Sequence, residues 1–354
     1  MKTIATFFTS IFISLGSLFG VNHHDVSAPV VVDPTPVVQT TPVMIKNPAV
    51  TSTPVTLATT SPTTSLPLGS LWQSVVPLGD GKYVTSAPKK GYIYICHVQS
   101  GGGGSQVNGP WIHGTTWNIT EKLHVEGNVS WPQATYKMNV SGATRTISSN
   151  DLPTDHTTGV FPIAASDPAA AYDRNPSSIS AHSYSFSLPA YPSEGTAPGC
   201  IYGEVGIMNN GVLLFDAFDA LYRDALAHEL QDTHDGHPNN EGYHKHGFIS
   251  DIKNVAVSNV VGFAFDGYPI TGPLLPSGKY ITSNDLDVCH GMTSSIVLDG
   301  KIQTSYHYVL TQDFPYSVSC FHGTSKITPR DLMSQSGGGM PPQNGNRPPP
   351  PPEN

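Results

Sequence analysis

Short β-prone runs closed by turn-forming residues recur through the central part of the chain. Residues 92–95 (Tyr-Ile-Tyr-Ile) form one such run, which a glycine-rich stretch closes. Within residues 201–214, the Asn210-Gly211 dipeptide predicts a hairpin, because it supplies the positive φ that a tight turn needs. Residues 255–265 predict a further apolar strand. The pattern predicts a mainly β (β-rich α+β) single domain.

One segment has the spacing of a helix instead. In residues 216–231 the apolar side chains recur at roughly helical spacing; they are Phe218, Leu221, Leu226 and Leu230. Asp216 or Asp219 is placed to cap the start. We therefore expect one principal helix near 216–231.

The first residues predict export. Met1 and Lys2 are followed by an uncharged, mostly apolar run over residues 4–21, which is the layout of a signal peptide. We assign residues 1–28 to the signal and expect a secreted or extracytoplasmic protein. The competing interpretation is an N-terminal anchor that stays uncleaved. No later stretch is apolar enough to cross a membrane.

Composition divides the rest of the chain. Residues 29–70 are rich in Pro, Thr, Val and Ser and almost without charge, which is typical of an extended linker. Residues 335–354 form a Gly/Pro-rich tail, which we expect to be disordered. The globular domain is therefore expected within residues 71–334.

Charge and cysteines exclude some function classes. The formal net charge of -9 disfavours a nucleic-acid partner, which needs a basic surface. The four cysteines lie far apart and none is in a CxxC pair, which disfavours a cysteine zinc site. In an exported chain an even number predicts disulfides, with three pairings open.

A histidine-rich segment carries the chemistry of this sequence. Five histidines fall within residues 228–246, accompanied by aspartates. On a helix, Asp224, His228 and Asp232 share one face, so that a carboxylate can orient an imidazole. Imidazole and carboxylate groups together suit a transition metal, and we expect zinc or copper. The alternative is a hydrogen-bond network that orders a loop.

Long motifs in this segment and around it resemble the YHYH protein family. They include residues 155–162 (DHTTGVFP), 172–176 (YDRNP), 223–229 (RDALAHE), 262–270 (GFAFDGYPI) and 287–291 (DVCHG). The motif that names the family is present as Tyr243-His244-Lys245-His246, with lysine in place of the second tyrosine. The resemblance implies a secreted domain with a His/Asp/Gly constellation and no established activity. The family motifs also imply a disulfide between Cys289 and Cys320, which leaves Cys96 to pair with Cys200.

We therefore expect a metal site in which His228 converges with the histidines that follow it. The expected ligands are His228, His237, His244, His246, His307 and Asp232. In an enzyme, Glu229 or Asp266 would be the general base for a metal-bound water. Whether the chain is an enzyme stays open.

The second hypothesis is a metal-independent module that contacts a cell surface or a polysaccharide, with structural histidines. Trp111, Trp117 and Trp131, with Tyr92 and Tyr94, would form its stacking platform, and the alternative for these rings is the more usual place in the core.

Overall fold

The computed structural model describes residues 68–98, 104–105, 107–240, 242–327 and 331. The predicted signal peptide, the tail 335–354 and all of the predicted linker before residue 68 lie outside these ranges.

Strands dominate the described residues. They are β1 (Val75–Pro77), β2 (Tyr83–Val84), β3 (Ile93–Tyr94), β4 (Ile112–His113), β5 (Thr116–Asn118), β6 (Tyr136–Ser141), β7 (Thr144–Ser149), β8 (Tyr184–Pro189), β9 (Glu194–Gly199), β10 (Glu204–Met208), β11 (Leu213–Phe215), β12 (Gly236–Pro238), β13 (Tyr243–Lys245), β14 (Val260–Ala264), β15 (Pro269–Thr271), β16 (Gly291–Leu298), β17 (Lys301–Val309) and β18 (Phe321–Gly323). The helices are α1 (Ala225–His228) and the 3-10 turns η1 (Pro168–Ala171) and η2 (Ser283–Asp285). The prediction of a mainly β fold is confirmed.

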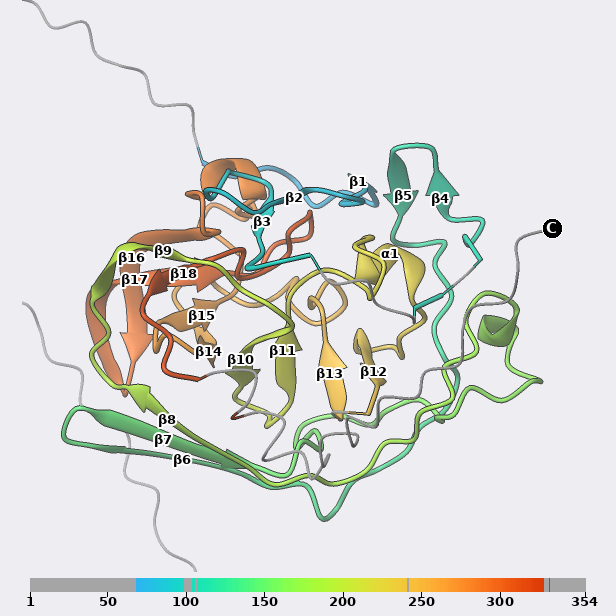
Figure 1. Cartoon of the computed structure of the whole chain (residues 1–354), viewed down its shortest axis with the longest axis horizontal. Helices are drawn as coiled ribbons and strands as arrows, with labels where there is room; N and C mark the ends of the chain where they lie inside the picture. The colour runs from blue at the N-terminus through green and yellow to red at the C-terminus, as the bar shows by residue number, and fades with distance from the viewer. Residues whose placement is uncertain (1–67, 99–103, 106, 241, 328–330, 332–354) are drawn as a thin grey trace, which may run out of the picture. The chain divides into compact units, whose positions relative to one another are not determined.

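The largest sheet has the strand order β12-β13-β11-β10-β14-β15-β17-β16. Two of its neighbouring pairs are parallel, β11 with β13 and β15 with β17, and the others are antiparallel. Figure 1 shows β12 and β13 at one end and the long β16–β17 hairpin at the other. The predicted Asn-Gly hairpin joins β10 to β11, and Gly211 has a φ of 91°.

A smaller sheet, β6-β7-β8, contributes side chains that pack against β14 and the turn after it. The ring of Phe186 in β8 lies 5.0 Å from that of Phe265, and the Arg145 guanidinium lies 4.1 Å from the ring of Phe263. Arg145 is fully buried and donates two hydrogen bonds of 2.8 Å to Asp299. Ionic pairing therefore satisfies the two terminal nitrogens of the buried guanidinium, while its flat face covers an aromatic ring and its Nε has no hydrogen-bond partner among the described residues.

The predicted helix 216–231 is wrong in its extent, because regular helix covers Ala225–His228 alone. Aspartates before this turn bind the backbone locally: Asp216 accepts from the amide of Phe218, and Asp219 accepts from those of Leu221 and Arg223. Such bonds compete with helical ones, so the segment folds as successive turns although its apolar spacing is helical.

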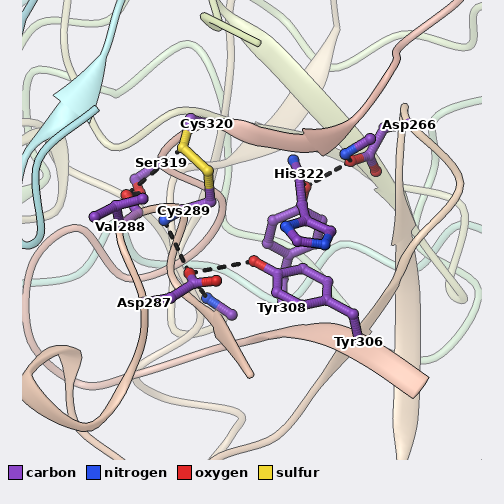
Figure 2. Close-up of a disulfide and its surroundings, with 11 residues drawn as sticks. Asp266, Asp287, Val288, Cys289, Tyr306, Tyr308, Ser319, Cys320 and His322 are labelled. Atoms are coloured by element: carbon purple, nitrogen blue, oxygen red, sulfur yellow. Dashed lines mark hydrogen bonds between the residues drawn. A yellow bond between two sulfur atoms is a disulfide. The ribbon is translucent and has the colours of Figure 1, made fainter. Parts of the chain in front are cut away.

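Two disulfides close the described structure, Cys96–Cys200 and Cys289–Cys320. These are the pairs that the family motifs imply. The loops that they close span 104 and 31 residues, so the chain-entropy model gives roughly 5 kcal/mol for the first and roughly 3–4 kcal/mol for the second. Figure 2 shows Asp287 beside the second disulfide, where it accepts bonds from the amide of Cys289 and the hydroxyl of Tyr306.

Two of the three tryptophans of the expected stacking platform belong to the core. Trp111 and Trp117 are buried, and their indole nitrogens donate to the carbonyl of Ala227 and the hydroxyl of Tyr316. They cannot offer a face to a sugar, so the tryptophan platform is wrong.

His307, expected as a metal ligand, lies inside the sheet instead. Its Nδ1 is 2.8 Å from the hydroxyl of Thr271 in β15, and its Nε2 is 2.8 Å from the hydroxyl of Ser294 in β16. Both nitrogens are thus engaged, and the imidazole bridges three adjacent strands. Burial lowers the pKa of His307 to about 4.

This burial predicts a loss of stability in acid. Because the unfolded imidazole titrates near 6.5, the unfolded chain binds the extra proton between about pH 6.5 and 4, and the free energy of unfolding falls as pH drops through that window. We expect His307 to account for roughly 2–3 kcal/mol of that fall. In urea unfolding at pH 6.5 and 4.5, His307→Gln should lose less stability on acidification than the wild-type protein. Equal losses in both proteins would contradict the assignment.

Candidate metal centre

The β12–β13 hairpin brings three histidines together. His237 and His244 face each other across the antiparallel pair, and His246 is two residues beyond His244, in the bend directly after β13. Opposed residues and residues two apart lie on one face of a sheet. The ring centroids are 4.6 Å apart for His237 and His244, 5.4 Å for His237 and His246, and 5.0 Å for His244 and His246. One nitrogen from each ring lies within 4.8 Å of the other two.

Backbone carbonyls orient two of these rings. Nδ1 of His244 donates to the carbonyl of Gly242 at 3.1 Å, and Nδ1 of His246 donates to the carbonyl of Asp216. In a neutral imidazole this leaves the Nε2 lone pair free, as metal-binding histidines require. Burial holds the pKa of His237 and His244 well below the usual range, and lowers that of His246 to about 4. All three rings are therefore neutral at neutral pH.

His237 has no such orienting bond. Both of its ring nitrogens are buried without a hydrogen-bond partner in the described part of the chain. Buried polar atoms are normally paired, because an unpaired one costs about 1–3 kcal/mol. A cation could bind one of these two nitrogens.

Glu229 completes the group from another element. It ends α1 with an extended backbone, which turns its side chain toward the histidines. Its Oε2 lies 3.5 Å from Nε2 of His237 and 3.6 Å from Nε2 of His246, and it too is buried with no hydrogen-bond partner among the described residues. Burial, followed by the charges of Asp219 and Asp173, raises the pKa of Glu229 well above its usual range. A bound cation would offset this cost of ionising the carboxyl group.

The group faces a cavity of about 960 Å³. Its walls include Glu229 and the three histidines, the segment 170–177, and Tyr202, Asp216 and Tyr222. Three neutral imidazoles, one carboxyl group and space for a ligand beside them are the parts of an open metal site.

His228, expected at the centre of this site, points elsewhere. Its Nε2 lies 3.0 Å from both carboxylate oxygens of Asp80, and the described metal-ligand group does not include it. The expectation assumed a helix long enough to align His228 with Asp224 and Asp232. Because the helix is a single turn, His228 and Glu229 point in different directions.

Asp232 is a structural residue. Its Oδ1 accepts from the amides of His234 and Gly236, and its Oδ2 accepts from the hydroxyl of Tyr243 and the amide of Gly159. Four donors occupy its oxygens, which leaves no lone pair directed at an ion. It fixes the turn that leads into β12.

Asp266, the other expected general base, lies in the turn between β14 and β15. Its Oδ2 accepts from the hydroxyl of Tyr308 at 2.6 Å and the amide of Gly323 at 2.9 Å, and its Oδ1 accepts from the amide of Tyr268. Figure 2 shows it beside His322, on the other side of that residue from the second disulfide. It does not line the cavity at the histidines.

Several residues that support the site gave no signal in the sequence. The carbonyls of Asp216 and Gly242 orient two ligands, and backbone acceptors cannot be read from residue type. Asp80, which pairs with His228 outside the site, gave no signal either, because it lies 148 positions before its partner.

None of the helices in the described ranges has the length and apolar character that a bilayer crossing requires. No curated protein and no solved structure matches the chain. The family model described as YHYH protein matches residues 185–277, a segment that contains Glu229 and all three clustered histidines. The chain therefore contains a YHYH domain, and the match includes the motifs at 223–229, 243–246 and 262–270. The motifs at 155–162, 172–176 and 287–291 lie outside the matched residues.

Proposed function

We propose that this chain is an exported protein whose YHYH domain binds one transition-metal ion, zinc or copper, through His237, His244 and His246. The observation that carries the proposal is their convergence, with a buried and unpartnered imidazole at His237. Hydrogen bonds among the described residues satisfy neither nitrogen of that ring, whereas a metal ion would take the lone pair of one of them. Zinc bonds of 2.0–2.1 Å require nitrogens about 3.4 Å apart, so we expect the rings to turn inward on binding.

Export is supported by two independent features. The first is the apolar N-terminal run of the sequence, which has a signal-peptide layout. The second is the pair of disulfides, which persist in oxidising compartments.

Glu229 is the candidate general base if the site is catalytic. Its carboxyl group lines the cavity beside the histidines and is not a member of the three-residue ligand group. An unligated carboxyl group at that position can take a proton from a reacting group held in the cavity. Asp266 does not line the cavity, and its oxygens accept hydrogen bonds from other residues.

The ligand set predicts the outcome of metal analysis. Protein purified without a His-tag and equilibrated with Zn²⁺ or Cu²⁺ should bind one metal ion per chain, measured by elemental mass spectrometry after free metal is removed. His237→Ala, His244→Ala and His246→Ala should each lose it, because each removes one of three protein ligands. His228→Gln and His307→Gln are the matched controls and should keep it. A wild-type protein without metal would instead favour the metal-independent module with structural histidines.

A separate substitution tests whether Glu229 is a metal ligand or a base. Glu229→Gln keeps the size of the side chain but removes its charge, and we expect the variant to retain one equivalent of metal. Competition with a chromophoric chelator measures the affinity, which should fall less than in His237→Ala. Loss of the ion as complete as in His237→Ala would make Glu229 a ligand and contradict its role as a base.

A further inference from the structure

The segment Tyr172-Asp173-Arg174-Asn175-Pro176 lies in the wall of the cavity that faces the histidines. It follows η1 and is far in sequence from both α1 and β12. The metal-binding proposal assigns no role to it, although its side chains contact the two elements that carry Glu229 and His237.

Asp173 holds the first of these elements. Its Oδ2 accepts a hydrogen bond of 3.0 Å from the amide of Leu230, the residue directly after Glu229. Asp173 is buried, so this bond forms away from competing water. It fixes the extended backbone at the point where the chain leaves α1.

Asn175 holds the second element. Its Nδ2 donates a bond of 2.8 Å to the carbonyl of Pro238, the residue directly after His237. Its Oδ1 accepts from the amide of Ser177 at 2.9 Å. Because the oxygen and the nitrogen of the amide each have a partner, the side chain is locked in one orientation.

The hydrogen bond of Asp173 therefore reaches the residue after Glu229, and that of Asn175 reaches the residue after His237. Glu229 and His237 belong to different elements, and His237 has no hydrogen bond of its own in the described residues to orient its ring. We propose that Asp173 and Asn175 are positioning residues of the metal centre, which clamp Glu229 and His237 against the same cavity wall. This inference rests on the proposed metal binding.

The test uses Co²⁺ as a spectroscopic probe in the full-length protein. We expect Asn175→Ala and the isosteric Asn175→Asp, which cannot donate to the Pro238 carbonyl, to lower the Co²⁺ affinity by about 10–100-fold. The visible absorption bands of the bound ion should shift as well, because His237 is released. Asp173→Ala should shift the bands through the displaced Glu229 but change the Co²⁺ affinity less than Asn175→Ala, because Glu229 is not a ligand. Asp173→Asn, which keeps an acceptor oxygen for Leu230, should restore the wild-type spectrum.

Asn150 provides the matched control. Its amide also bridges two segments, accepting from the amide of Thr135 and donating to the carbonyl of Gln133, but it does not line the cavity. Asn150→Ala should lower the midpoint of thermal unfolding without changing Co²⁺ affinity or spectrum.

Two outcomes are separable. If the wild-type protein binds Co²⁺ and Asn175→Ala binds it with the same affinity and spectrum, the positioning role is wrong while the metal site stands. If the wild-type protein binds no Co²⁺, the metal site itself fails.

Discussion

The register between β12 and β13 is the constraint on which the site depends. Pairing of His237 with His244 puts two imidazoles on one face, and His246 joins them from the bend directly after β13. A shift by one residue would turn His244 and His246 to the opposite face and break the group. The register is held on both sides of β13, because that strand also pairs in parallel with β11.

The opposite face of β13 fixes this register. Tyr243 donates to Asp232 at 2.8 Å, and the fully buried Lys245 pairs with Asp251 at 2.8 Å. In the segment 243–246 the two histidines therefore line the cavity, whereas Tyr243 and Lys245 bind carboxylates that support the strand. Lysine in place of the second tyrosine is tolerated here because Asp251 neutralises its buried charge.

Gly236 shows how closely this hairpin is packed. A Cβ at this position would lie 2.1 Å from the hydroxyl oxygen of Tyr243, so no larger residue fits without displacing that ring. Gly236 thus makes room for the tyrosine that fixes the register. The ring of Tyr243, on the neighbouring strand, therefore requires glycine at position 236.

Local chemistry in the sequence determined the strand-rich fold and the Asn-Gly hairpin, since each depends on neighbouring residues alone. Family motifs further implied the two disulfide pairs. Tertiary structure decided which polar residues meet. Asp216 and Asp219 bind the nearby backbone and shorten the expected helix, which sends His228 to Asp80 and Glu229 to the histidines. Strand order places His307 five strands away from β13, roughly 24 Å across the sheet. Residue type marks a histidine as a possible ligand, but pairing between distant segments decides whether its nitrogens face an open cavity or neighbouring hydroxyl groups.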